Sequence, residues 1–292
     1  MTGPERRRHD FGSSALLVPA LAIFAVFVVG AGCLLVAYSL TNWRGYGADM
    51  SYVGLDNYRR LFSTDAFSRS LGITLVFTVA FVVLVNCLGL VIAILIAQPT
   101  GQNRFLRALF FLPSVLPAVA VGFIWRRLFE PGGIVPAIFG LFGEEPRIFS
   151  DNSLALSAVI WTAVWQTLGL VVVLLIARIV TIPRDLYEAA ALDGAGAWAR
   201  ARFVTLPLLV PTIFVAIVFT TVTGLREFDR PVALTDGGPA RATEMIAMRI
   251  MDEAFQRGNF GLAAAQAVVL MLITAVVAFA LHRAGRALEH RG

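Results

Sequence analysis

Lysine is absent from this sequence of 292 residues, so all 24 basic residues are arginines. A standard phosphate-binding P-loop ends in Gly-Lys-Ser or Gly-Lys-Thr, and the missing lysine therefore excludes one from this chain. Any ATP hydrolysis in which the chain takes part must come from a partner.

Cysteine and histidine are almost as scarce, and their positions do not favour chemistry. Cys33 and Cys87 lie within apolar runs, whereas His9, His282 and His290 lie near the chain ends. These positions offer no Cys/His dyad, no metal-ligand cluster and no disulfide framework. We therefore expect the chain to bind no metal or cofactor and to perform no covalent catalysis.

Charge is also in short supply. Charged residues make up 15% of the sequence and hydrophobic residues 58%, with a mean hydropathy of +0.78, whereas a soluble domain is about 25% charged. The isoelectric point is about 9.9, but the arginines are scattered through loops and tails, which argues against a nucleic-acid partner. Basic loops are typical of membrane proteins. The composition predicts an all-α integral membrane protein.

Six apolar runs are long enough to cross a bilayer as helices, because about 30 Å of hydrocarbon takes about 20 helical residues. These runs cover residues 16–40, 70–97, 105–129, 154–178, 208–226 and 262–282. No other segment could bury a separate core, so we expect one transmembrane domain over residues 15–285, with tails at 1–14 and 286–292. The first run is longer than the apolar part of a signal peptide and lacks a cleavage motif, which predicts an uncleaved span.

The orientation follows from charge near the first span. Arg6, Arg7 and Arg8 precede it and favour an amino terminus in the cytoplasm. Six spans then place both termini inside, together with the segment 182–207 between the fourth and fifth runs.

The segment 182–207 carries a helix–break–helix pattern. Pro183 suits the first turn of a helix, where a missing N–H costs nothing. Asp193 and Gly194 favour a chain reversal, since glycine adopts positive φ without penalty. The run 198–204 predicts two further helical turns, which we expect Pro207 to end.

The spacing within this segment resembles the cytoplasmic signature of permease subunits in binding-protein-dependent ABC importers. That signature reads Glu-Ala-Ala, three residues, Gly, nine residues, an aliphatic residue, any residue and Leu-Pro. Valine at position 204 is the only departure, because the family most often has isoleucine there. In this sequence the pattern is carried by Glu188, Ala189, Ala190, Gly194, Val204, Leu206 and Pro207.

The resemblance implies the fold of a type I importer permease, in which this loop is a coupling helix that docks into a groove of a separate ATPase. Glu188 would meet a basic residue of that ATPase, and Gly194 would permit the turn between the two short helices. The alternative is an ordinary amphipathic loop between spans. The implied coupling residues are Glu188, Ala189, Ala190, Asp193, Gly194, Ala195, Leu206 and Pro207.

Three further motifs resemble the carbohydrate branch of the family, whose members include importers of maltose and glycerol phosphate. They are Gly-Leu-Asp-Asn-Tyr at 54–58, Leu-Thr-Asp-Gly-Gly-Pro at 234–239 and Gly-Asn-Phe-Gly-Leu-Ala at 258–263. This resemblance implies a bacterial inner-membrane subunit that forms a path for a sugar or polyol with a second permease. The implied partners are an external solute-binding protein, membrane lipid and two ATPase subunits, which bind ATP and Mg²⁺. Another solute class remains an alternative.

Polar and aromatic side chains in or beside the spans are candidates for the substrate path. A charge at the bilayer centre costs about 2.5–3.5 kcal/mol, so the charges that follow the fifth run belong at its outer end or in a water-filled vestibule. Trp165 could instead join an interfacial aromatic belt, and Gln266 could instead form a hydrogen bond with a neighbouring helix. The candidates are Thr220, Thr223, Gly224, Glu227, Trp165, Gln166 and Gln266.

Two classes of alternative function are disfavoured. An ion-coupled carrier would need acidic residues within its spans, and every Asp and Glu lies outside the six predicted runs. A membrane anchor without transport would not need Pro113 and Pro117, which interrupt the third run and predict a bent helix. Such a helix leaves carbonyl groups that must line protein or a wet cavity, although simple packing also accounts for the pair.

Overall fold

The computed structural model describes residues 10–47, 50–143 and 146–289. Over these residues the regular secondary structure is helical, apart from one isolated bridge between Thr41 and Tyr52. The predicted tails 1–14 and 286–292 lie partly outside the described residues, and helix α1 already begins at Asp10. Five helices in the described part are long and apolar enough to cross a membrane, and one bent pair makes a sixth. The chain divides into two compact units, Met1–Thr64 with Ile250–Val269 and Asp65–Arg249 with Leu270–Gly292.

The first unit contains the predicted first span and the Gly-Leu-Asp-Asn-Tyr motif. Helices α1 (Asp10–Phe24), η1 (Ala25–Gly30) and α2 (Ala31–Ser39) follow one another without a break and are followed by the short α3 (Asp56–Ser63). Asn57 of α3 donates hydrogen bonds to the carbonyls of Ser39 and Thr41 at 2.9 and 2.8 Å. The motif thus satisfies the free carbonyl groups at the end of the first span.

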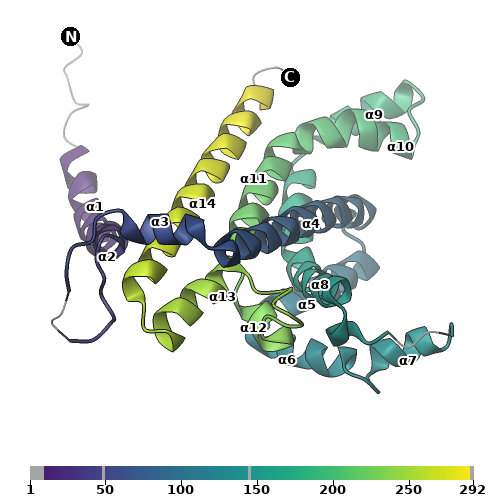
Figure 1. Ribbon diagram of the computed structural model, residues 1–292. Coiled ribbons are helices and arrows are strands. Elements are labelled where there is room, and N and C mark those ends of the chain that lie inside the picture. The colour runs from purple at the N-terminus through teal and green to yellow at the C-terminus, as the bar shows by residue number, and fades with distance from the viewer. Residues whose placement is uncertain (1–9, 48–49, 144–145, 290–292) are drawn as a thin grey trace, which may run out of the picture. The chain divides into compact units, whose positions relative to one another are not determined.

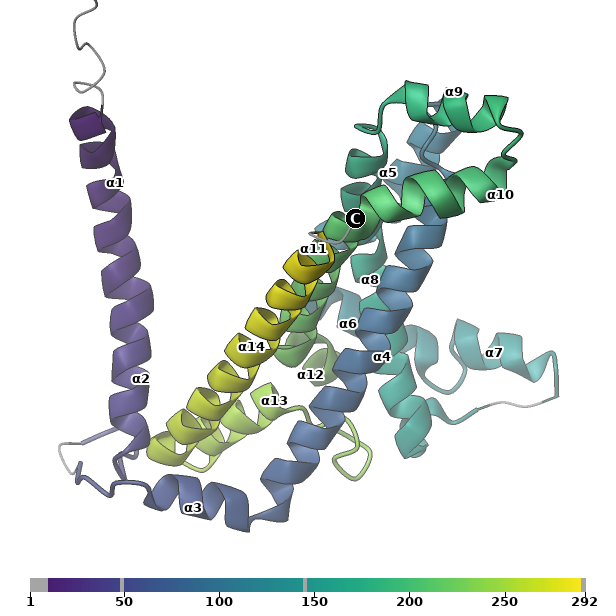
Figure 2. The same cartoon turned by 90° about the horizontal axis from the view of Figure 1, so that it is seen from above.

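The second unit is built around α8 (Asn152–Ile179), which packs against α4 (Asp65–Leu95), α5 (Gly101–Val115) and α11 (Leu206–Leu225) (Figures 1 and 2). The close approach of α8 to α5 and to α4 depends on glycine residues. A Cβ at Gly169 would lie 2.0 Å from the carbonyl oxygen of Phe110, and one at Gly89 would lie 2.8 Å from a methyl group of Val171. Small residues therefore fix the spacing of α8 from both neighbours.

The third predicted run, 105–129, is not one continuous helix. Helix α5 ends at Val115 and α6 (Ala118–Phe129) begins after Pro117. The chain bends by 100° between Gly101–Val115 and the segment Ala118–Gly140, which α6 begins. Leu116 adopts an extended conformation, as expected for a residue before proline, and Pro117 has no N–H for the helical ladder. The expected bend is thus confirmed, but it splits the run. Helix α7 (Ile134–Gly140) and η2 (Ile148–Ser150) follow.

The predicted pair of short helices between α8 and α11 is present, but the second does not stop at Pro207. Helix α9 (Arg184–Leu192) is followed by Gly194 with φ of +78°, then by α10 (Ala197–Arg200) and η3 (Ala201–Thr205), which continues directly into α11. The η3 segment is a π-helix, in which the N–H of Leu206 reaches back to the carbonyl of Ala201. This wider turn accommodates the proline at the start of α11. The candidate span therefore covers Ala197–Leu225 rather than 208–226.

The Leu-Thr-Asp-Gly-Gly-Pro motif forms the predicted turn. It ends α12 (Asp229–Thr235), where Asp236 and Gly237 have φ of 50° and 80°. The hydroxyls of Thr235 and Thr243 lie 2.7 Å apart and close the loop. Helices α13 (Ile246–Met251), η4 (Asp252–Gln256) and α14 (Phe260–Glu289) complete the described chain.

Candidate functional site

Six of the predicted coupling residues lie on a projecting hairpin formed by α9 and α10, whereas Leu206 and Pro207 begin α11 (Figure 2). None of them is buried: Glu188, Ala189, Asp193, Gly194 and Pro207 are exposed, and Ala190, Ala195 and Leu206 are half-buried. The hairpin is fixed at its base, because the hydroxyl groups of Tyr187 and Thr205 lie 3.0 Å apart.

Large apolar side chains on this hairpin face outward. Leu192 is 90% exposed, Trp198 is 74% exposed, and Phe203 at the start of the long helix is 72% exposed. An apolar surface on a projecting element is typical of a protein contact. A cavity of about 500 Å³ lies behind the hairpin and is lined in part by Arg184 and Arg200.

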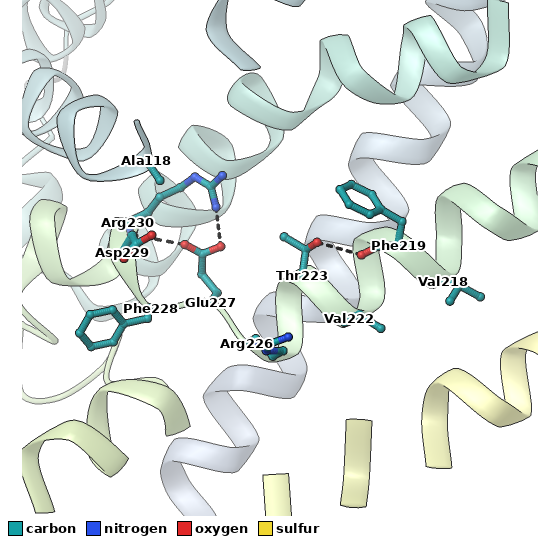
Figure 3. A pocket seen from close by; sticks show the side chains of 10 residues that line it. All are labelled: Ala118, Val218, Phe219, Val222, Thr223, Arg226, Glu227, Phe228, Asp229 and Arg230. Carbon is teal, nitrogen blue, oxygen red and sulfur yellow. Dashed lines mark hydrogen bonds and ion pairs between the residues drawn. The ribbon is translucent and has the colours of Figure 1, made fainter. Parts of the chain in front are cut away.

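A second cavity, of about 630 Å³, lies at the opposite end of α11 (Figure 3). Its lining residues are Ala118, Val218, Phe219, Val222, Thr223, Arg226, Glu227, Phe228, Asp229 and Arg230. Two predicted path residues, Thr223 and Glu227, are therefore among them. The Thr223 hydroxyl donates to the carbonyl of Phe219 at 2.9 Å, which leaves its oxygen free to accept.

A buried ion pair forms part of the wall of this second cavity. Arg230 and Glu227 are only 7% and 5% exposed, and the guanidinium Nη1 donates to the carboxylate Oε2. The backbone N–H of Arg230 also donates to Glu227 Oε1 at 3.3 Å. A buried charge of either sign requires such a partner. The sequence prediction missed Arg230, although its three-residue spacing from Glu227 at the start of a helix was a usable signal.

Gln166 connects this ion pair to the break between α5 and α6. Its Oε1 accepts from Arg230 Nε at 2.8 Å, and its Nε2 donates to the carbonyl of Leu116 at 2.8 Å. The Ser114 hydroxyl donates to the main-chain carbonyl of Gln166 at 2.7 Å. Gln166 is buried and reaches the cavity only through Arg230.

The remaining candidates lie away from the lining of this cavity. Thr220 accepts a hydrogen bond from Asn86 Nδ2 at 2.9 Å and joins α11 to α4. Gly224 lies close to Thr78 of α4, and Trp165 contacts the ring of Trp125 edge-on at 5.3 Å. Gln266 is buried, and within the described residues its Oε1 has no hydrogen-bond partner.

Comparison with known proteins identifies the family. Residues 86–291 match the family described as binding-protein-dependent transport system inner membrane component. The diacetylchitobiose uptake system permease protein NgcF of Streptomyces coelicolor is 34% identical over 94% of this chain and 83% of its own. The multiple sugar-binding transport system permease protein MsmF of Streptococcus mutans is 32% identical over 91% of this chain and 92% of its own.

A solved structure shares the fold. A chain in the crystal structure of a bacterial ABC transporter involved in the import of the acidic polysaccharide alginate superposes with a TM-score of 0.82, covering 95% of this chain and 96% of that one. The two sequences are 21% identical, so this likeness concerns the fold alone. Together with the matched family, it identifies the arrangement of helices as that of an ABC transporter permease. The chain therefore belongs to the binding-protein-dependent transport system inner membrane components, and it is the multi-pass permease of such a transporter rather than its ATPase.

Proposed function

We propose that this chain is one of two permease subunits of an ATP-driven importer for a sugar or related polyol. A second, related permease completes the path, an external solute-binding protein delivers the solute, and two copies of an ABC ATPase bind ATP and Mg²⁺ and hydrolyse the ATP. The observation that carries this proposal is the α9–α10 hairpin, which presents the Glu-Ala-Ala and Gly positions of the importer signature outside the helical core. The relatives named as chitobiose and multiple-sugar permeases support the solute class.

The hairpin is suited to transmit movement because it is continuous with a long helix. The helical run Ala197–Leu225 has 29 residues, which corresponds to about 44 Å at about 1.5 Å per residue. One end of this run lies in the hairpin, and the other end lines the 630 Å³ cavity. Closure of the ATPase pair would displace the hairpin and thereby bias the helices between inward-open and outward-open arrangements.

The same helix supports a membrane orientation for the chain. If the hairpin meets an ATPase, it faces the cytoplasm, and the end of α11 near Leu225 lies toward the outside. This agrees with the arginine triplet before the first span and puts both termini in the cytoplasm. The cavity then faces the side from which a solute-binding protein delivers its cargo.

We assign the 630 Å³ cavity to the solute path. It combines apolar side chains with a small number of polar groups, as solute sites generally do. The hydroxyl of Thr223 and the charged groups of Arg226 and Glu227 supply donors and acceptors for sugar hydroxyls.

Thr223→Leu tests this assignment, because it removes the hydroxyl and narrows the cavity. We expect sugar uptake into proteoliposomes containing the assembled complex to fall at least tenfold, with the ATPase still bound. Val215→Leu is the matched control, since Val215 lies on the same helix and is exposed but does not line the cavity. Release of the ATPase by Thr223→Leu would make this residue structural instead.

Uptake also tests the solute class. The complex with its binding protein should take up at least one neutral sugar from a panel in the presence of ATP, and uptake should persist when ion gradients are collapsed. Uptake of only peptides or amino acids would contradict the sugar assignment. Uptake that requires an ion gradient and not ATP would support an ion-coupled carrier.

A further inference from the structure

The cavity at the outer end of α11 contains a balanced cluster of charges. The four charged side chains that line it are Arg226, Glu227, Asp229 and Arg230. Two arginines and two carboxylates give a formal charge of zero. A change in any one of them would leave a net charge at the cavity, and the apolar residues that share the lining limit the screening of that charge by water.

Arg230 is held in one orientation within this cluster. Its Nη1 donates to the Glu227 carboxylate, and its Nε donates to Gln166 Oε1 at 2.8 Å. Gln166 is itself fixed by its bond to the Leu116 carbonyl at 2.8 Å. The guanidinium cannot turn without breaking both contacts, so its direction is set before any solute arrives.

The third guanidinium nitrogen of Arg230 is Nη2, and neither of the two contacts above uses it. Within the described part of the chain, Nη2 donates to no protein acceptor, and it is not among the enclosed nitrogens that lack a partner. Arg230 is also one of the residues that line the cavity. Figure 3 shows Arg230 beside Glu227, with Thr223 on a neighbouring part of the lining.

We propose that Arg230 is a specificity-determining residue of this permease, an inference that rests on the cavity being the solute path. Its Nη2 edge donates hydrogen bonds to hydroxyl or ring oxygens of the solute, while Glu227 cancels its charge. The balanced cluster therefore favours an uncharged saccharide over an acidic one. An acidic solute would lose part of its hydration without gaining a net counter-charge, which is costly beside the buried pair Arg230 and Glu227.

The charge balance can be measured without knowing the solute. Ala118, which lines the cavity, is changed to cysteine in a chain whose Cys33 and Cys87 are replaced by alanine. The probes are two methanethiosulfonates, the anionic sulfonatoethyl reagent and the cationic trimethylammonioethyl reagent, applied to the whole complex in proteoliposomes. The quantity measured is the ratio of the anionic to the cationic modification rate.

Two substitutions should move this ratio in opposite directions. Glu227→Gln leaves an uncompensated arginine and should raise the ratio on the order of tenfold, whereas Arg230→Gln should lower it by a similar factor. A control cysteine at Ser68, which is exposed and does not line the cavity, should show no change. If Arg230→Gln fails to assemble, Asp229→Asn provides a second positive shift, because Asp229 is an exposed carboxylate of the same lining.

A transport measurement completes the test. With the neutral sugar found by uptake screening, Glu227→Gln should increase the uptake of its uronate analogue relative to the sugar itself, a ratio that a purely structural loss would not move. Equal ratios in wild type and variants, or a cysteine at 118 that reacts with neither reagent, would overturn the proposal. Labelling as expected in a complex that transports no sugar would refute the proposed function and leave only the charge balance of the cavity established.

Discussion

Gln166→Leu is the substitution whose effect the structure predicts most fully. Leucine has a similar volume but removes both the acceptor for Arg230 Nε and the donor to the Leu116 carbonyl. A buried polar group left without a partner costs about 1–3 kcal/mol. Hydrogen bonds between membrane helices average only about 0.6 kcal/mol in double-mutant cycles, because the unfolded chain finds other partners.

These magnitudes set the expected loss. The Arg230 guanidinium and the Leu116 carbonyl both lose their partners, and the first of these groups is charged. Arg230 lines a cavity, however, from which it can recruit water. We therefore expect the free energy of unfolding to fall by about 2–3 kcal/mol, between the two limits. The Ser114 hydrogen bond to the main chain of Gln166 is unaffected, so the decrease in the free energy of unfolding reports on the Gln166 side chain alone.

The assay is equilibrium unfolding of the purified chain in mixed micelles, by titration with SDS and with tryptophan fluorescence as the signal. Gln102→Leu is the matched control, because Gln102 is an exposed glutamine on α5, and a surface exchange should change stability by less than about 0.5 kcal/mol. A double-mutant cycle with Arg230→Met should give a coupling energy of at least about 0.5 kcal/mol. A Gln166→Leu variant as stable as wild type would refute the reasoning that this side chain holds α8, α12 and the broken span together.

Three further outcomes follow from the packing. Gly169→Leu should prevent stable folding, because its Cβ would lie 2.0 Å from the Phe110 carbonyl oxygen. The measurement is the yield of monodisperse protein after size-exclusion chromatography, and the control Gly72→Leu, which has open space around it, should keep that yield. Thr220→Val should lower the free energy of unfolding by about 1 kcal/mol in the same SDS titration, since Asn86 loses an acceptor. Gly194→Val should strain the hairpin turn at φ of +78°, at a cost of about 1–2 kcal/mol, and reduce stimulated ATP hydrolysis, while Gly196→Ala should not.

The sequence was sufficient for elements that depend on local pattern. The apolar run 154–178 corresponds to α8, which covers Asn152–Ile179, because a long apolar stretch between polar ends has few alternatives. The turn at Gly194 followed in the same way from the conformational freedom of glycine. Family resemblance supplied the expected role of the hairpin, which no local pattern could give and which stays a prediction.

Features set by tertiary contacts could not be predicted. Gln166 and Arg230 are 64 residues apart in sequence, and only the fold brings them together. Pro207 should end a helix by the usual rule, but a π-helical turn before it lets the helix continue. Thr220 and Gly224 were interpreted as path residues because they are small and polar, whereas the structure places them against α4. The same residue types serve both purposes in membrane helices.

The measurement that tests the account most directly is ATP hydrolysis by the complex that is recovered when this chain is purified from its native membrane. We predict recovery of an ABC ATPase and a second permease, with hydrolysis stimulated by the solute-loaded binding protein. Glu188→Arg on the exposed face of α9 should abolish the stimulation and weaken ATPase retention, because it reverses the charge that the proposed coupling surface presents to a basic residue of the ATPase. If the chain is recovered alone, or if Glu188→Arg leaves the ATPase bound and fully stimulated, the α9–α10 hairpin is not the coupling element.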